Sequence, residues 1–321
     1  MNSGRVLITG GAGFLGSHLC EHYLSAGWDV VCMDNERTGR RANLAHLESN
    51  PRFTYLHQDV TIECDLDGDI DLVFHLASLA SPPFYKAFPI ETLDTGSLGT
   101  RNCLELAARK NARLIYASTS EVYGDPLVSP QPESYWGNVN PIGPRSMYDE
   151  SKRFGEALVT AYQSSRQTNT GIVRIFNTYG PRMRPDDGRV VTSFLGQIIA
   201  NRPLTIHGDG SQTRSFCYVA DLVDGLVRMA SSTEPGPVNL GNPTEEISIR
   251  ELAERLCALF DRPFVAGPPQ PDQDENDPKR RCPDISKARA VLGWEPKTAF
   301  EDGMRATHRY LESEFHDSKN A

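Results

Sequence analysis

The chain has 321 residues, of which 39% are hydrophobic and 23% are charged, with a formal net charge of −9 at pH 7. This length allows one large domain or two smaller ones with a well-buried core. The acidic balance argues against a nucleic-acid partner, because binding to phosphates requires a net or clustered positive surface. If the protein binds an anionic ligand, the site must be a local group of basic residues.

Two further classes of protein are disfavoured by the distribution of apolar residues and cysteines. No apolar run is long enough to cross a bilayer, and the run at residues 6–9 is too short for a signal peptide. The seven cysteines are odd in number and lack C-x-x-C spacing, and the eight histidines show no spacing typical of metal ligands. We therefore expect buried thiols in a cytoplasmic protein, with no membrane partner and no bound metal.

Short β-branched runs alternate with helical patterns through the first half of the chain. Strands are predicted at 5–9, 29–33, 53–57, 72–75, 114–117 and 172–176, and helices at 14–26, 98–110 and 147–162. This alternation is typical of βαβ units, so it predicts an α/β fold with a Rossmann-type doubly wound parallel sheet. The apolar faces of helices 98–110 and 147–162 either cover that sheet or form a dimer interface. We expect a homodimer through these two helices.

After residue 177 the elements become shorter, and glycine and proline become frequent. Ser248 and Glu251 form a capping-box pattern that opens a helix at 249–260. The polar segment 267–283 is predicted to be a long loop. We expect the doubly wound domain at 1–176 with a return at about 213–241, and a smaller α/β domain, which would bind the substrate, at 177–212 and 242–313. Residues 314–321 are expected to be a flexible tail.

A glycine pattern at the end of the first predicted strand indicates a dinucleotide site. Gly10, Gly13 and Gly16 enclose Phe14 and Leu15 and open the first helix, where a pyrophosphate can approach the backbone. The alternative is a glycine-rich turn without a ligand.

Asp34, at the end of the second strand, favours NAD over NADP, because its carboxylate accepts hydrogen bonds from ribose hydroxyls and repels a 2′-phosphate. The nearby Arg37, Arg40 and Arg41 weaken that preference slightly. Further along the cofactor we expect Asp59, Val60, Leu76 and Ala77.

Tyr148 and Lys152 are four residues apart on a predicted helix, so their side chains share one face. A tyrosine acts as a base near neutral pH only if its pKa is lowered, and a nearby ammonium has that effect. The pair alone is also compatible with an ordinary surface position. Its place downstream of the glycine pattern, and of the cluster Ser118, Thr119 and Ser120 at the end of the fifth strand, favours a catalytic role.

These motifs together resemble the extended short-chain dehydrogenase/reductase family, in its nucleotide-sugar branch, and most closely the UDP-glucuronic acid decarboxylases. The similar stretches cover most of the chain, at residues 9–16, 75–83, 117–124, 135–143, 148–152, 174–182, 187–191, 212–216, 239–243 and 280–285. The stretches 81–83 and 136–143 and the arginine Arg281 are the features more particular to the decarboxylases.

The resemblance implies a reaction through a 4-keto sugar. Tyr148 takes the proton of the sugar 4-hydroxyl as C4 passes hydride to NAD⁺, CO₂ leaves from the β-keto acid, C5 is protonated, and reduction gives UDP-xylose. Thr119 would bond O4, and Glu121 would lie near the carboxylate and C5. Arg281 would hold the carboxylate or donate a proton, with Arg280 as the fallback. UDP-sugar contacts are expected from Ser81, Tyr85, Glu121, Asn177, Arg182, Arg189, Arg214 and Arg281.

The residue before Glu121 separates the neighbouring activities. Related dehydratases carry an aspartate where this chain has Ser120, and simple 4-epimerases usually lack the glutamate. The chain departs from the family pattern at Gly96, where many members have asparagine, at Ser151, where glycine is frequent, and at Cys282. The alternatives that remain open are release of the UDP-4-keto-pentose, C4 epimerisation of a UDP-sugar acid, and a non-catalytic NAD-binding sensor.

Overall fold

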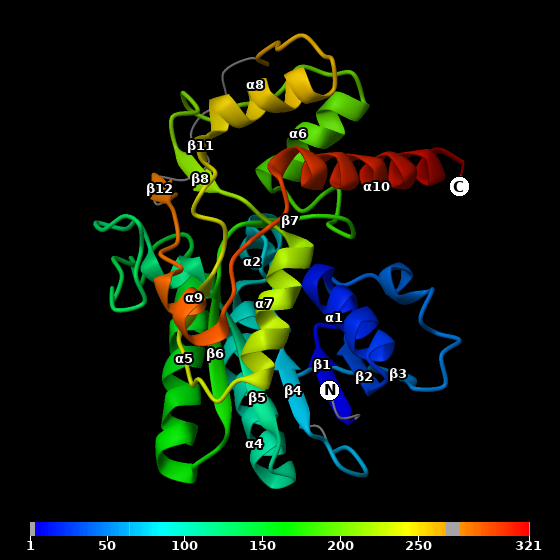
Figure 1. Ribbon diagram of the computed structural model, residues 1–321, viewed down its shortest axis with the longest axis vertical. Coiled ribbons are helices and arrows are strands. Elements are labelled where there is room, and N and C mark those ends of the chain that lie inside the picture. The colour runs from blue at the N-terminus through cyan, green and yellow to red at the C-terminus, as the bar shows by residue number, and fades with distance from the viewer. Residues whose placement is uncertain (1–3, 64, 268–276, 321) are drawn as a thin grey trace.

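A parallel sheet of seven strands lies at the centre of the larger part of the molecule in the computed structural model, which describes residues 4–63, 65–267 and 277–320 (Figure 1). Its strand order is β10-β6-β5-β4-β1-β2-β3. The strands are β1 (Arg5–Thr9), β2 (Asp29–Asp34), β3 (Phe53–His57), β4 (Leu72–His75), β5 (Arg113–Thr119), β6 (Thr170–Ile175) and β10 (Val238–Leu240). The order reverses between β1 and β4, and open α/β sheets bind ligands at the carboxyl ends of strands around such a point. The predicted doubly wound fold is confirmed.

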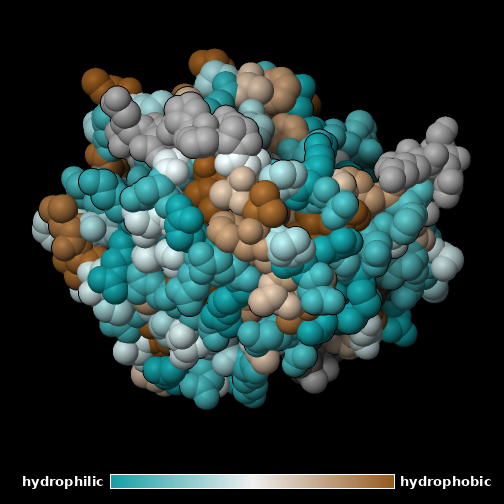
Figure 2. All heavy atoms as spheres, turned by 90° about the horizontal axis from the view of Figure 1, so that it is seen from above, coloured by the Kyte–Doolittle hydropathy of each residue, from teal (hydrophilic) through white to brown (hydrophobic). Residues whose placement is uncertain are grey.

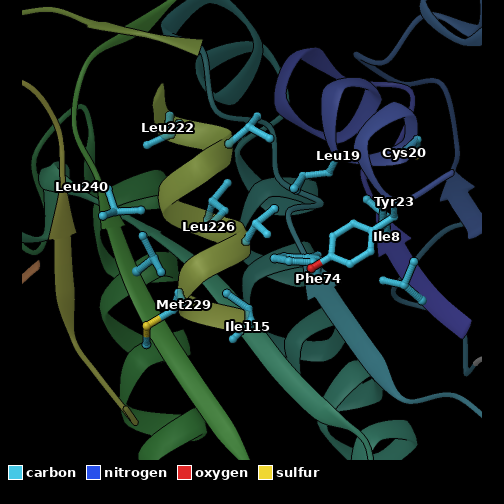
Figure 3. Close-up of a cluster of buried hydrophobic side chains, with 14 of the residues drawn as sticks. Ile8, Leu19, Cys20, Tyr23, Phe74, Ile115, Leu222, Leu226, Met229 and Leu240 are labelled. Atoms are coloured by element: carbon cyan, nitrogen blue, oxygen red, sulfur yellow. The ribbon is translucent and has the colours of Figure 1, made fainter. Parts of the chain in front are cut away.

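Helices cover both faces of this sheet (Figure 1). One face carries α1 (Phe14–Ser25) and α7 (Val219–Ser231), and the other carries α4 (Thr100–Lys110) and α5 (Ser146–Arg166). On α7 the buried residues Val219, Leu222, Val223, Leu226 and Val227 follow helical spacing. Figure 3 shows Leu222, Leu226 and Met229 of α7 gathered with Ile115 of β5 and Leu240 of β10 in one buried cluster.

Short elements between the strands and helices shape the edge of the sheet where the strands end. They are η1 (Arg41–Leu44), α2 (Pro82–Ala87), α3 (Pro89–Asp94) and η3 (Ser120–Tyr123), together with the π-helical turn η2 (Thr95–Gly99) that leads into α4. The π-helical turn occupies positions 98 and 99, which were predicted to begin the helix 98–110.

A second hydrophobic cluster lies above the carboxyl ends of the sheet, among α6 (Val190–Ile199), α8 (Ile249–Leu259) and α10 (Phe300–Asn320) (Figure 1). A small sheet of β11 (Glu246–Ser248), β8 (Thr213–Ser215) and β12 (Arg280–Arg281) adjoins it. Ser248 caps α8 as predicted, because its hydroxyl accepts a hydrogen bond of 3.0 Å from the backbone N–H of Glu251. Seen from above in Figure 2, this end is mainly hydrophilic with small hydrophobic areas.

The chain crosses between the two clusters several times. It passes through the paired strands β7 (Thr178–Tyr179) and β9 (Cys217–Tyr218), returns to the large sheet as α7 and β10, and later adds α9 (Ser286–Leu292) beside β10. Strand β8 lies in the small sheet, so the return begins a few residues after the expected position 213. Helix α10 runs to Asn320, past residue 314, where a flexible tail was expected.

Part of the predicted loop 267–283, residues 268–276, lies outside the described residues. No helix in the described part of the chain is long and apolar enough to cross a membrane.

Candidate active site

A cavity of about 790 Å³ opens at the carboxyl ends of β1, β2, β4 and β5 and extends beneath α6 and β8. It has the size of a cofactor or ligand site. The predicted residues that line it are Gly10, Gly13, Phe14, Leu15, Gly16, Asp34, Asp59, Val60, Leu76, Ala77, Ser81, Tyr85, Thr119, Glu121, Tyr148, Lys152, Asn177, Arg182, Arg189 and Arg214. Arg281 is the one predicted site residue that is not part of this lining.

The glycine turn is packed so closely against neighbouring backbone that no side chain fits at Gly10 or Gly16. Gly10 has a φ of +70°, and a Cβ placed there would lie 2.8 Å from the backbone nitrogen of Ala77. A Cβ at Gly16 would lie 2.2 Å from the carbonyl oxygen of Gly10. Gly13 stands at the N-cap of α1, and no side chain makes a capping hydrogen bond there. The free N–H groups and dipole of a helix N-terminus bind a pyrophosphate.

Asp34 ends β2 at the adenosine side of this turn. Its Oδ2 accepts a hydrogen bond of 3.0 Å from the Ala12 N–H, and its Oδ1 accepts one of 2.8 Å from the Glu36 N–H. Burial raises the pKa of this carboxyl, against the opposing effect of those two hydrogen bonds. Each carboxylate oxygen keeps a second acceptor site for a ribose hydroxyl. The residues therefore fit NAD.

The three arginines that follow Asp34 in the sequence bond other side chains or stack on an aromatic ring. Arg40 donates to Glu314 at 2.5 Å and to the Tyr310 hydroxyl at 2.8 Å, both on α10. Arg41 bonds Glu48 at 2.7 Å. The Arg37 guanidinium lines the cavity and lies 4.8 Å from the centre of the Phe88 ring. Two of the three arginines are thus engaged away from a 2′-phosphate position, which agrees with the preference for NAD.

Asp59 lies in the turn after β3, and its carboxylate is held in place by its neighbours. Asn35 donates to its Oδ2 at 2.7 Å, and the N–H and hydroxyl of Thr61 donate to its Oδ1 at 2.8 and 2.7 Å. Burial alone would raise the pKa of this carboxyl, but these hydrogen bonds lower it. A rigid, charged Asp59 at the wall of the cavity is suited to hold the adenosine end of a cofactor.

Tyr148 and Lys152 lie on the buried face of α5, one turn apart. Lys152 donates a hydrogen bond of 2.8 Å from Nζ to the carbonyl of Ala117, and burial lowers its pKa to about 8. The pKa of Tyr148 is raised to about 12, first by burial and then by the negative charge of Glu121. The expected lowering by the lysine is therefore wrong for this structure. A hydrogen bond with Thr119 and the positive charge of Arg189 act in the lowering direction without outweighing burial.

Tyr85 stacks on Tyr148 with ring centres 5.2 Å apart and planes within 6° of parallel. Both rings are buried, so the stack fixes the direction of the Tyr148 ring. The Tyr85 hydroxyl is buried and has no hydrogen-bond partner within the described residues. A buried hydroxyl without a partner costs free energy, so it is available to bond a ligand in the cavity.

Five charged side chains form an alternating chain along one wall of the cavity. Arg281 bonds Oε1 of Glu121, and Arg145 donates to Oε2 of the same carboxylate at 2.7 Å. The second arm of Arg145 reaches Oδ1 of Asp277 at 3.2 Å, and Oδ2 of Asp277 accepts from Arg214 at 2.8 Å. Burial alone would raise the pKa of Glu121, but its two guanidinium partners lower it to about 2. Glu121 is therefore ionised.

Arg145 and Asp277 were missed by sequence reasoning. Asp277 borders the residues that the structure does not describe, and no motif singles it out. Arg145 stands at the N-cap of α5, three residues before Tyr148. Residues three apart at a helix start share a face, so this spacing was a usable signal.

Arg281 lies behind Glu121. Besides Glu121, it donates to the Ser120 hydroxyl at 3.0 Å and to the Gly124 carbonyl at 3.2 Å, and 2% of it is exposed. Ser120 therefore helps to hold this arginine. Arg280 points outward on the same strand and bonds Glu246 at 2.6 Å, so the fallback position is away from the cavity.

The remaining predicted substrate residues also line the cavity. Arg189 caps α6 and contacts Asp187 at 3.3 Å and the carbonyl of Ala80 at 3.2 Å. Arg182 pairs with Glu21 on α1, and Ser81 stands at the N-cap of α2. The backbone carbonyl of Asn177 accepts a hydrogen bond of 2.9 Å from the Cys217 N–H.

Comparisons with known proteins agree with this site. Residues 6–241 match the model of the NAD dependent epimerase/dehydratase family. The chain is 49% identical to UDP-glucuronic acid decarboxylase 3 of Arabidopsis thaliana over 94% of this chain and 86% of that protein. It is 47% identical to UDP-glucuronic acid decarboxylase 1 of Danio rerio over 98% of this chain and 74% of that protein.

Solved structures with the same fold belong to related enzymes. UDP-N-acetylglucosamine 4-epimerase from Methanobrevibacter ruminantium M1 superposes with a TM-score of 0.88 at 27% identity, over 98% of this chain and 100% of that one. UDP-glucuronic acid 4-epimerase from Bacillus cereus, solved with UDP-glucuronic acid and NAD, gives 0.83 at 30% identity, over 96% and 99%. The chain therefore belongs to the NAD dependent epimerase/dehydratase family and, within it, to the UDP-glucuronic acid decarboxylases.

Proposed function

We propose that the protein decarboxylates UDP-glucuronic acid through a 4-keto intermediate to give UDP-xylose, using bound NAD. The observation that carries this proposal is that one cavity joins a dinucleotide turn, the Tyr148–Lys152 pair and an ionised Glu121 between arginines. An epimerase requires the first two features only. The named relatives, at 47–50% identity, support the same reaction.

The first step is oxidation at C4 of the sugar. Tyr148 accepts the proton of the 4-hydroxyl, and its ring is directed by the stack with Tyr85. To accept this proton Tyr148 reacts as its phenolate, and Lys152, anchored on the Ala117 carbonyl one turn away, supplies the positive charge that favours that form. Thr119, which shares a hydrogen bond with Tyr148, is placed to bond O4. When bound, NAD⁺ supplies the acceptor for the hydride and later returns it.

The second step breaks the bond between C5 and C6. The 4-ketone is β to the carboxylate, so C6 leaves as CO₂. The electrons of the broken C5–C6 bond form an enolate with the ketone. Ionised Glu121 is placed to order the water that then protonates C5. Reduction of the ketone, with the proton returned from Tyr148, completes UDP-xylose. The net change is loss of CO₂ with uptake of one proton at C5.

Two neighbouring outcomes follow from the same chemistry. If the 4-keto-pentose dissociates before reduction, the product is UDP-4-keto-pentose and reduced cofactor remains on the protein. If C4 is reduced from the opposite face before CO₂ leaves, the product is the C4 epimer of the sugar acid. A non-catalytic sensor is the least supported alternative, because the cavity brings together Tyr148, Lys152, Thr119 and Glu121.

The protein is further proposed to form a homodimer through the helices that cover the α4–α5 face. Leu104 and Leu106 of α4 are buried, so they cover the sheet. Ile90 and Leu93 of α3, Leu98 of η2 and Phe154 of α5 are exposed, and α3 and η2 both contact α5. Light scattering on the purified protein tests this, with Phe154→Glu expected to give a monomer. Ile142→Glu, at an exposed position outside α3, η2 and α5, is the control.

A cytoplasmic location is also proposed, on the basis of the cysteines. The six cysteines in the described part of the chain are buried and none of them is paired in a disulfide, as expected in a reducing compartment. Cys64 lies outside the described residues.

The experiment that tests the proposed function is incubation of the purified protein with UDP-glucuronic acid and NAD⁺, with products followed by mass spectrometry and proton NMR. The expected product is a UDP-pentose with release of CO₂, and the ratio of xylose to ketone reports how completely hydride returns. Formation of UDP-galacturonic acid without loss of CO₂ would replace the proposal with epimerisation.

A further inference from the structure

The alternating chain of charges carries more positive than negative groups. Arg281, Arg145 and Arg214 contribute three guanidinium groups, and Glu121 and Asp277 contribute two carboxylates. Three of these side chains are almost fully enclosed, since 2–11% of the side chains of Arg281, Arg145 and Arg214 is exposed. A partly buried cluster with surplus positive charge is matched to one further anion.

Asp149, next to Tyr148, does not supply that anion. Burial and the neighbouring Glu121 raise the pKa of its carboxyl to about 8, so it is mainly neutral at pH 7. The surplus charge is therefore left for a ligand.

Of the two arginines that hold Glu121, only Arg145 is reachable from the cavity. Arg145 lines the cavity together with Tyr85, Tyr148 and Glu121, and its guanidinium carbon lies 5.9 Å from the centre of the Tyr85 ring. Arg281 is outside the lining, and its two terminal nitrogens, Nη1 and Nη2, already bond Glu121, Ser120 and Gly124. A group on the substrate therefore meets Arg145 first.

The partner on the other side of Arg145 is exchangeable. Asp277 is the most exposed member of the chain of charges, with 35% of its side chain accessible. It is bound to Arg145 and to Arg214, the two cavity arginines, by one oxygen each. Because Asp277 is partly solvated and gives each arginine a single oxygen, an incoming carboxylate of better geometry displaces it.

On the basis of the proposed function, we propose that Arg145 is the residue that binds the C6 carboxylate of the sugar, by exchanging its contact with Asp277 for the substrate, while Arg281 stays on Glu121 and positions it. Arg145 is then the determinant that separates a UDP-sugar acid from a neutral UDP-sugar. A sugar with a C6 hydroxymethyl group presents no charge to replace Asp277 and leaves the existing ion pairs in place.

The exchange brings the departing carboxylate next to Glu121. Arg145 already contacts Oε2 of Glu121 at 2.7 Å through Nη2. A substrate carboxylate bound to Nη1 is therefore separated from Glu121 only by the guanidinium group. The fork geometry of arginine allows two carboxylates at once, which a lysine does not. Glu121 is in this way presented to C5 only when an acidic sugar is bound.

Binding to the holoenzyme tests this assignment without turnover. In a Tyr148→Phe background loaded with NAD⁺, the ratio of the Kd for UDP-glucose to the Kd for UDP-glucuronic acid is measured by calorimetry. Arg145→Gln is expected to lower this ratio roughly ten- to hundredfold, because a charge-assisted contact with the sugar carboxylate is lost. Arg145→Lys is expected to recover part of it. Arg281→Gln, the matched control, is expected to leave it within about threefold.

A surface variant provides a second, independent measurement. Asp277→Asn removes the competing anion. It is expected to lower the Kd for UDP-glucuronic acid by up to about fivefold, with a smaller change in the Kd for UDP-glucose. The inference is overturned if Arg145→Gln retains bound NAD and leaves the ratio of the two Kd values unchanged. It is also overturned if only Arg281→Gln removes the preference for UDP-glucuronic acid. If the background protein with both arginines shows no preference for the acid, the proposed function itself fails.

Discussion

Gly96 and Ser151 share one space between η2 and α5. A Cβ at position 96 would lie 2.5 Å from the Cβ of Ser151 and 3.1 Å from its carbonyl oxygen. Both positions were expected from the sequence to depart from the family pattern, with no reason to connect them. In the structure they are connected, because a side chain at position 96 would collide with the Ser151 side chain.

This relationship predicts strong coupling between the two positions. Gly96→Ala is expected to lower the free energy of unfolding by about 1–3 kcal/mol through overpacking. Ser151→Gly alone is expected to cost about 1 kcal/mol, because glycine is unfavourable within a helix. The double variant should be more stable than the sum of the two changes by at least about 0.5 kcal/mol. Urea unfolding of the four proteins measures this, and strict additivity would contradict the shared space.

Tyr148→Phe is expected to reduce kcat by roughly 10²–10⁴-fold, because the proton acceptor of the oxidation step is removed. The aromatic stack with Tyr85 remains, so NAD binding and unfolding are expected to change little. Single-turnover kinetics with UDP-glucuronic acid provide the measurement. A kcat within threefold of the unchanged protein would remove Tyr148 from the mechanism.

Tyr85→Phe is the matched partner of that variant, since it removes a hydroxyl from the other ring of the same stack. The Tyr85 hydroxyl has no partner within the described part of the chain, so its loss is expected to leave the free energy of unfolding unchanged or slightly raised. Tyr85→Ala is expected to cost about 3–5 kcal/mol, because the buried ring itself is lost. If thermal unfolding shows Tyr85→Phe to be as damaging as Tyr85→Ala, the hydroxyl has a structural role.

Asp149 predicts a specific dependence of stability on pH. Its pKa is raised from 3.8 to about 8, first by burial and then by Glu121. Between these values the folded protein holds a proton that the unfolded chain releases, so stability contributed by this group is lost as pH rises toward 8. Asp149→Asn is expected to reduce the loss of unfolding free energy between pH 5 and about 8.5. Denaturant titrations at both pH values test this, and an unchanged pH slope would contradict it.

The sequence was informative where a local pattern meets a regular element. The strands from Arg5–Thr9 to Thr170–Ile175, the glycine turn and the Ser248 cap all lie within two or three residues of their predicted positions. Each depends on residues close in the sequence. The strands depend on β-branched runs, the glycine turn on the step from strand to helix, and the cap on a hydroxyl that accepts a hydrogen bond from the N–H three residues later.

The parts that were not predicted depend on contacts between distant segments. Arg145 and Asp277 are 132 residues apart, and Glu121 and Arg281 are 160 apart. The raised pKa of Tyr148 also follows from burial and from Glu121, which no spacing within α5 encodes. Strand β12 places Arg281 inward and Arg280 outward, and that alternation became visible only when β12 paired with β8.

The most direct test is turnover of UDP-glucuronic acid deuterated at C4 by the NAD⁺-loaded protein. The expected result is loss of CO₂ and a UDP-xylose that retains deuterium at C4, because the label leaves and returns within one cavity. A UDP-sugar acid that keeps its carboxylate, whether or not C4 is inverted, would show that the protein does not decarboxylate this substrate.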